Sequence, residues 1–290
     1  MSDFSHPLIK LLAGTLTLLG LAGLIYLFIY SGNSGSVNPT KLYLESKLAK
    51  EDEAQKLLQF NLVDPSKAPE PLQEMAKLGF QAMIDTKKLA PDYVGSKLSC
   101  TNCHFAGGNT TGGTSGGISL AGVATKYPNF DQYLNKIIDL PTRINNCFLK
   151  SMNGKPLPLD SELMLAFVTY FQWISKDLPI YGDIPWLGLK LLKSRHVGNS
   201  INGEKVFNTH CALCHKEQYR GKIYPPPLWG NDSSNDAAGM SFIPRLAAFI
   251  YWNMPYNNDP PVLSEEEAID VAAYIISKPR PHLDQSTDKK

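Results

Sequence analysis

The chain has 290 residues, with 28 basic and 27 acidic side chains and a formal net charge of +1. This balance, without a long run of either sign, excludes a concentrated basic face and gives no support for nucleic-acid binding. The length suits two domains, and the 21 prolines and 22 glycines predict a large share of loop.

The first distinctive element is an apolar stretch near the N-terminus, residues 11–30, which holds no charged side chain. As a helix rising ~1.5 Å per residue it would be long enough to cross a bilayer. It ends in Phe28, Ile29 and Tyr30 without a small-x-small cleavage site, which favours an uncleaved anchor over a signal peptide. We expect residues 1–36 to form a membrane anchor and tether, and residues 37–69 to form a partly helical stalk.

Two similar halves follow the stalk, and we expect each to be a small helical domain, over residues 70–195 and 196–282. Either Asp160 or Ser161 can cap a helix that starts at Glu162, and Ser264 with Glu267 forms a capping box before another. Strand signals are weak throughout. The predicted fold is therefore all-α, with two small helical domains behind an N-terminal transmembrane helix.

A C-x-x-C-H motif occurs once in each half. This motif is the attachment signature of c-type haem, in which two thiols form thioethers and the adjacent histidine binds iron. A zinc ribbon would place its cysteine pairs closer together, and a thioredoxin-like dithiol would need a βαβ pattern. Disulfides within the pairs would be strained. We therefore predict two covalently bound haem c groups, haem 1 and haem 2, on these residues: Cys100, Cys103 and His104; Cys211, Cys214 and His215.

Haem attachment of this kind takes place on the outer face of bacterial inner membranes. The predicted localisation is the inner membrane, with one N-terminal anchor and the rest of the chain in the periplasm.

A methionine supplies the expected sixth iron ligand in the second half. Met254 lies 39 residues after His215, in an M-P step before the C-terminal helix. Histidine and methionine ligation raises the haem potential and suits electron transfer. The alternatives are that Met254 only packs in the core, or that Met240 is the ligand.

The first half has a cysteine at nearly the same offset. Cys147 lies 43 residues after His104 and is the one cysteine outside the two motifs. Ligation of haem 1 by Cys147 would lower its potential, so that electrons would flow from haem 1 to haem 2. The alternative is a buried free thiol.

Helical spacing adds two residues to this candidate site. Arg143, Cys147 and Ser151 are four apart and share one face of a helix. A guanidinium one turn from a thiol favours its thiolate form. Arg143 could equally pair with a haem propionate.

Residues 70–282 resemble the dihaem thiosulfate dehydrogenases, the tetrathionate-forming periplasmic cytochromes c. The resemblance rests on five ordered segments, of which the one around Cys147 is the most specific because generic class I cytochromes lack it: KLAPDYVGSKLSCTNCH, RINNCFLKSMNGKPL, PPLWGNDSSNDAAGM, FIYWNMP and DVAAYIISKPRPH.

The resemblance implies a fold of two class I cytochrome c-like domains behind the N-terminal transmembrane helix. It also implies that two thiosulfates join into tetrathionate with release of two electrons, reversibly in some members. Haem 1, with His104 and Cys147 as ligands, would be the active site. Haem 2, with His215 and Met254, would pass electrons to a periplasmic or membrane-bound acceptor such as a cytochrome c or an oxidase. Arg143 and Ser151 match positions that line the substrate pocket.

Charge and local composition refine this expectation. Thiosulfate is a dianion, so Lys136 and Lys150 would help to offset the repulsion between two substrates. The chain departs from the family in its anchor and in the glycine-rich segment 105–122 after the first motif. It also has Asn253 before Met254, where some members have a lysine that can compete for iron.

Two other functions compete with the enzyme. One is a membrane-tethered dihaem electron carrier without substrate chemistry, which the anchor favours. The other is a redox sensor in which ligand exchange at Cys147 signals, although no signalling domain is evident. The segment around Cys147 favours the enzyme, because a pure carrier has no evident need for a thiolate ligand.

Overall fold

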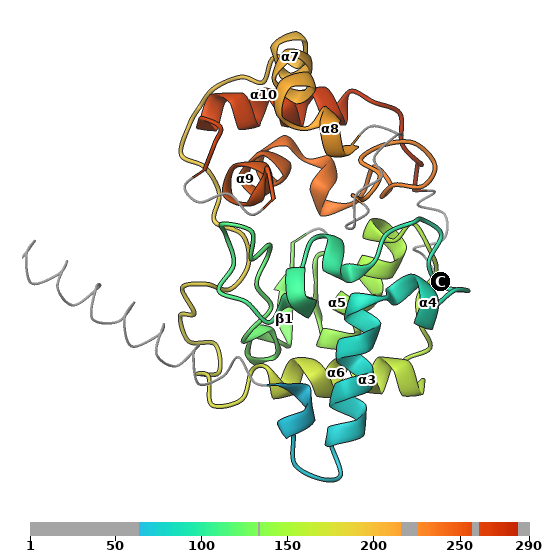
Figure 1. Ribbon diagram of the computed structural model, residues 1–290. Coiled ribbons are helices and arrows are strands. Elements are labelled where there is room, and N and C mark those ends of the chain that lie inside the picture. Colours follow the sequence, from blue (N-terminus) through green and yellow to red (C-terminus); the bar gives the residue numbers. More distant parts are fainter. Residues whose placement is uncertain (1–63, 133, 216–224, 257–260, 284–290) are drawn as a thin grey trace, which may run out of the picture. The chain divides into compact units, whose positions relative to one another are not determined.

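The computed structural model describes residues 64–132, 134–215, 225–256 and 261–283 (Figure 1). The predicted anchor and tether, and all but the end of the stalk, lie outside these residues. No helix within the described part of the chain is both long and apolar enough to cross a membrane. The two motif-bearing parts are called here the first half, residues 64–195, and the second half, residues 196–283.

The first half is built on two helices that pack against each other, α3 (Gln73–Ile84) and α6 (Glu162–Trp173). Of the two predicted caps, it is the side chain of Ser161 that caps α6, by accepting a hydrogen bond from the backbone of Met164. Gly79 lets the two backbones approach closely, because a Cβ there would lie 2.2 Å from the carbonyl oxygen of Ala166. The core around this crossing includes Met83, Met164, Phe167 and Tyr170.

Short helical segments complete the first half. They are η1 (Pro65–Lys67), α4 (Thr86–Leu89), η2 (Cys100–Asn102), η3 (Phe105–Gly108), η4 (Val123–Lys126), α5 (Leu140–Asn146) and the π-helical turn η5 (Cys147–Ser151).

A small antiparallel sheet corrects the prediction of an all-α fold. Its strands are β1 (Asn129–Asp131) and β2 (Lys136–Ile138), with Phe130 opposite Ile137. Both of these side chains are exposed, by 53% and 71%. Strands this short, with an apolar pair turned to solvent, lack the alternation of buried and polar residues by which a sequence reveals a half-buried strand.

The second half repeats the helical plan. Helix α10 (Glu265–Ile276) packs on α7 (Ser200–His210) and on α9 (Ile243–Asn253), as Figure 1 shows. The predicted capping box is present, since Ser264 and Glu267 exchange hydrogen bonds. Gly203 has the role of Gly79, because a Cβ there would lie 1.9 Å from the carbonyl oxygen of Asp270. The remaining segments are α8 (Ala212–His215) and η6 (Gly239–Ser241).

Buried asparagines connect the two halves. The Asn235 side chain, which is fully buried, donates a hydrogen bond to the carbonyl oxygen of Leu149 at 2.8 Å. The Asn253 side chain accepts one from the backbone of Gly117 at 2.7 Å. A surface ion pair between Lys97 and Asp232, at 2.7 Å, adds a further connection. The segments that carry Cys147 and Met254 therefore each contact the other half.

Candidate active site

The first motif occupies a well-defined turn. Cys100 begins η2, whose start is held by reciprocal hydrogen bonds between Ser99 and Asn102. The backbone N–H of Cys100 also donates to the hydroxyl of Thr86 at 2.9 Å. Burial raises the pKa of the Cys100 and Cys103 thiols to about 12. Both are therefore neutral thiols at physiological pH before any covalent attachment.

The histidine of this motif is fixed from behind by a backbone carbonyl. His104 Nδ1 lies 2.8 Å from the carbonyl oxygen of Ile118. A carbonyl can only accept a hydrogen bond, so Nδ1 carries the proton and Nε2 is left with a free lone pair. Burial lowers the pKa of His104 to about 4, which keeps the ring neutral. A neutral imidazole with a supported Nδ1–H is the form that binds a metal through Nε2.

The second motif shows the same arrangement. His215 Nδ1 lies 3.3 Å from the carbonyl oxygen of Pro226, and burial lowers the pKa of this histidine. Burial also raises the pKa of Cys211 to about 11. All five cysteines are free thiols, so the motifs are not closed as disulfides. Paired thiols beside an imidazole with an available Nε2 fit haem c at both motifs.

Cys147 lies within electrostatic range of both cysteines of the first motif, and its negative form raises the pKa of each. It stands at the junction of α5 and the π-helical turn η5. Arg143, one turn earlier, donates a hydrogen bond to Cys147 Sγ at 2.8 Å. The charge of Cys147 is the main reason that the pKa of Arg143 is raised. Arg143 and Cys147 thus share a face, as the spacing predicted.

Tyr127 is a candidate site residue that sequence reasoning missed. It forms a side-chain hydrogen bond with Arg143, and burial raises the pKa of its phenol. The negative charge of Asp131, on β1, also raises the pKa of Arg143. No motif or spacing points to either residue, because both reach Arg143 through the hairpin that precedes α5.

The other predicted charged and hydroxyl residues hold more peripheral places. Ser151 ends the π-helical turn and is half-buried. Lys150 is half-buried beside it, and its carbonyl oxygen accepts a hydrogen bond from Asn235. Lys136 is exposed on β2. The π turn has a wider repeat than an α-helix, so Ser151 is rotated relative to Cys147 from the position that the four-residue spacing implies.

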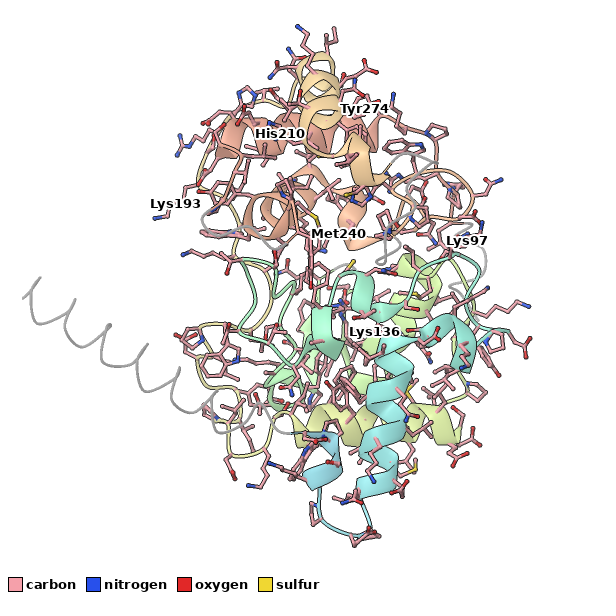
Figure 2. The ribbon with its side chains drawn as sticks, in the orientation of Figure 1. Lys97, Lys136, Lys193, His210, Met240 and Tyr274 are labelled. Atoms are coloured by element: carbon pink, nitrogen blue, oxygen red, sulfur yellow. The ribbon has the colours of Figure 1, made fainter. Side chains whose placement is uncertain are left out.

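Both candidate methionines of the second half pack against its core. Met254 directly follows the last residue of α9, and its backbone N–H still bonds to the helix at Ile250. Met240, labelled in Figure 2, lies on η6. Both methionines therefore lie in the same half as His215, and both remain candidate ligands of haem 2.

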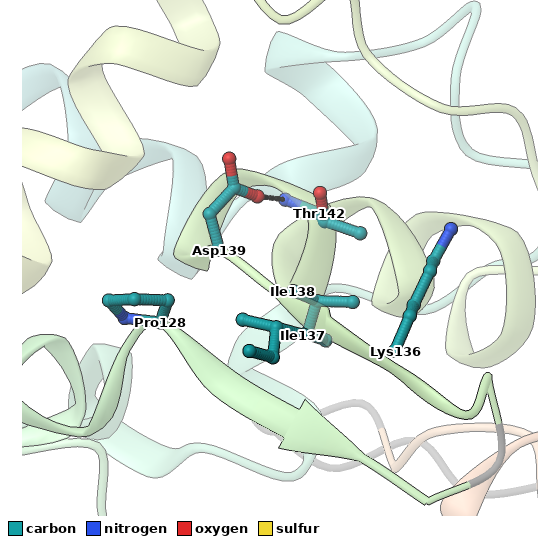
Figure 3. Close-up of a pocket in the computed structure, with 6 residues that line it drawn as sticks. All are labelled: Pro128, Lys136, Ile137, Ile138, Asp139 and Thr142. Atoms are coloured by element: carbon teal, nitrogen blue, oxygen red, sulfur yellow. Dashed lines mark hydrogen bonds between the residues drawn. The ribbon is translucent and has the colours of Figure 1, made fainter.

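A surface pocket of about 330 Å³ lies beside this region but does not contain Arg143, Cys147 or Ser151 (Figure 3). It is lined by Pro128, Lys136, Ile137, Ile138, Asp139 and Thr142. Asp139 accepts a hydrogen bond from the backbone of Thr142 at 2.8 Å, which caps α5 and lowers the pKa of this carboxyl. The side chains of Lys136 and Asp139 do not converge in this pocket. We therefore assign the candidate chemistry to the Cys147 region instead.

Comparison with known proteins assigns a family to each half of the chain. Residues 94–180 match the SoxA/TsdA cytochrome c domain, and residues 200–278 match the cytochrome c family. The thiosulfate dehydrogenase of Thiomonas intermedia (strain K12) is 38% identical over 214 residues, which cover 72% of this chain and 67% of that protein. The chain belongs to the SoxA/TsdA cytochrome c family.

Further relatives carry the same description. The thiosulfate dehydrogenase of Allochromatium vinosum is 31% identical over 222 residues, which cover 74% of this chain and 82% of that protein. The solved thiosulfate dehydrogenase (TsdBA) from Marichromatium purpuratum, in its as isolated form, superposes with a TM-score of 0.68 at 29% identity. That match covers 76% of this chain and 49% of the solved chain, so this SoxA/TsdA protein spans about half of that structure.

The family models assign a cytochrome c domain to each half, which implies bound haem c in this SoxA/TsdA protein. The fold is correspondingly mostly helical.

Proposed function

We propose that this chain is a dihaem thiosulfate dehydrogenase, which joins two thiosulfates into tetrathionate and passes the electrons on. The observation that carries the proposal is the 2.8 Å hydrogen bond from Arg143 to Cys147 Sγ, beside the first haem-attachment motif. A carrier without substrate chemistry has no evident use for a thiol paired with a cation at this place. The family relationship supports the same activity.

The reaction is a two-electron oxidation that forms one S–S bond. Two thiosulfate dianions give one tetrathionate dianion and two electrons, with no proton released. The main electrostatic obstacle is the repulsion between the two substrates. The guanidinium of Arg143 is placed to bind sulfonate oxygens and to reduce that repulsion, with Tyr127 as a neutral donor next to it. Ser151 and Lys150 add donors at the end of the same turn.

The two haems would be held by their motif cysteines, with His104 and Cys147 at haem 1 and His215 and Met254 at haem 2. When bound, they would take up the two electrons one at a time and pass them outward. The protein's contribution is positional. Backbone carbonyls orient both histidines, and Arg143 holds the Cys147 sulfur.

We further propose that residues 1–36 anchor the chain in the inner membrane, with the described residues in the periplasm. The support is the uncharged stretch 11–30 and the fact that haem attachment to C-x-x-C-H motifs occurs on that side. The electron acceptor would then be a periplasmic or membrane-bound cytochrome c or oxidase.

The test is thiosulfate-dependent haem reduction in the full, haem-loaded chain, compared with the Cys147→Gly variant. Met164→Leu is the matched control, because it removes a buried sulfur from the same half at little cost in packing. We expect rapid reduction with tetrathionate as product in the wild type and the control, and loss of both in Cys147→Gly. If wild-type protein is reduced by a quinol system but not by thiosulfate, the chain is a tethered electron carrier and the proposal is wrong.

A further inference from the structure

Asn253 uses both ends of its side chain inside the protein. It is 1% exposed and is the last residue of α9. Its Oδ1 accepts a hydrogen bond from the backbone N–H of Gly117 at 2.7 Å. Its Nδ2 donates to the carbonyl oxygen of Phe249, one turn back in α9, at 3.1 Å. The orientation of the amide is thereby determined, since one partner only donates and the other only accepts.

Gly117 lies next to the residue that orients His104. The following residue, Ile118, donates its N–H to the carbonyl oxygen of Cys103 at 2.9 Å, and its own carbonyl accepts from His104 Nδ1 at 2.8 Å. Gly117 has a φ of +69° and lies so close to Cys103 that a Cβ would be 2.7 Å from that carbonyl oxygen. Only glycine fits this close approach. The segment that supports His104 is therefore held at Gly117 by a residue of the other half.

The backbone of Asn253 is joined directly to Met254, the proposed ligand of haem 2. The backbone N–H of Met254 bonds to Ile250 at 2.8 Å, so the methionine begins where α9 ends. An aromatic cluster surrounds the same junction. Phe105, the residue after His104, makes edge-to-face contacts with Phe249 and Tyr256, with ring centroids 5.9 and 5.4 Å apart.

We propose that Asn253 is a positioning residue that couples the iron ligands of the two haems, holding the Met254 segment and the His104 support in one hydrogen-bonded unit. The path runs from Met254 through the Asn253 amide to Gly117, and from Ile118 to His104 Nδ1. The inference rests on the proposed haem ligands but not on the substrate. A lysine at this position has no acceptor atom and could not bind the Gly117 N–H.

Two variants with the same number of side-chain heavy atoms separate the hydrogen bond from simple packing. Asn253→Asp keeps an oxygen for Gly117, whereas Asn253→Leu removes the acceptor but keeps the branched shape. Asn202→Ala is the control, because it removes an asparagine amide from the same half at α7, where it binds Asp270. Asn253→Ala is included as a smaller truncation in case the leucine variant does not fold, with haem content and circular dichroism as the folding criterion.

The readouts are hydrogen–deuterium exchange over residues 110–121 and the reduction potential of each haem, measured electrochemically in the haem-loaded full chain. In Asn253→Leu we expect exchange at Gly117 to rise at least about tenfold, since a buried amide loses its partner. Both potentials should shift, and the far-red absorbance of methionine-ligated ferric haem should weaken. Asn253→Asp should keep slow exchange, and Asn202→Ala should match the wild type.

A shift at haem 2 alone, or at neither haem, in a folded leucine or alanine variant would overturn the coupling. These readouts do not use thiosulfate. A wild-type protein that is not reduced by thiosulfate would therefore refute the proposed enzyme while leaving this test intact.

Discussion

The guanidinium of Arg143 donates a hydrogen bond to the sulfur of Cys147 across one helical turn, at 2.8 Å. Tyr127 binds the same guanidinium from the segment before the hairpin. The arginine is thus oriented from two sides, which matters because a bidentate cation stabilises developing charge only if its direction is fixed in advance.

Replacing Arg143 tests this arrangement. We expect Arg143→Ala to lower the rate of tetrathionate formation by roughly 10²-fold or more, the usual cost of removing one oriented donor from a charged transition state. Arg143→Lys keeps the charge but loses the planar donor pair, so it should recover only part of the rate. Steady-state kinetics with thiosulfate provide the measurement. Equal activity in the lysine variant and the wild type would show that charge alone is sufficient.

The two methionines of the second half can be distinguished spectroscopically. Met254→Leu should abolish the far-red absorbance of methionine-ligated ferric haem and lower one of the two haem potentials, because it removes the thioether ligand. Met240→Leu, a swap of the same kind on η6, should leave both features unchanged. The opposite pattern would identify Met240 as the ligand.

The buried carboxyl of Asp270 should make the stability of the second half depend on pH. It is 3% exposed, and burial by itself would raise the pKa of its carboxyl. Hydrogen bonds from Asn202, Asn199 and His196 outweigh burial, so the net pKa is lowered. A depressed pKa stabilises the folded state above the unfolded value of ~3.9, and that stability is lost as pH falls through the folded pKa.

The corresponding variant is Asp270→Asn. It should lower the free energy of unfolding at neutral pH by about 1–3 kcal/mol, because buried donors lose an ionised acceptor. It should also make the stability decrease less as the pH falls below about 4. Thermal unfolding as a function of pH measures both effects. Asp92→Asn, at an exposed aspartate of the first half, is the control. It should leave the loss of stability at acidic pH unchanged.

The helix crossing in the first half depends on a missing side chain. Gly79→Ala would place a Cβ 2.2 Å from the carbonyl oxygen of Ala166, so α3 and α6 would have to separate. We expect a loss of about 1–3 kcal/mol or more, seen as a lower Tm of the haem-loaded chain. Gln81→Ala, on the exposed side of α3, should change stability by less than about 0.5 kcal/mol. Similar melting of the two variants would contradict the close crossing.

Local patterns predicted much of this structure. The helices at 162–173 and 265–276 begin at their expected caps, and on the second helix Ile269, Val271, Ala272 and Ile275 are all buried. Capping and helical periodicity act over a few residues, so they can be read directly from the chain. The attachment motifs are local in the same sense, because covalent chemistry dictates their spacing.

What could not be predicted depends on contacts between distant residues. The hairpin that brings Tyr127 and Asp131 to Arg143 has strands of three residues, too short for a periodic signal. No residue pattern indicates the π-helical turn that follows Asn146. The bond between Gly117 and Asn253 joins residues 136 positions apart, and no sequence pattern indicates such a partner.

That long-range bond has a consequence for how the protein matures. The support of His104 is complete only when residue 253 has been synthesised and folded, although both cysteines of the first motif emerge far earlier. The segment behind His104 therefore gains its Asn253 partner only when the second half packs against it. Closing so long a loop costs more entropy than forming a local turn, so we expect this contact to form late in folding.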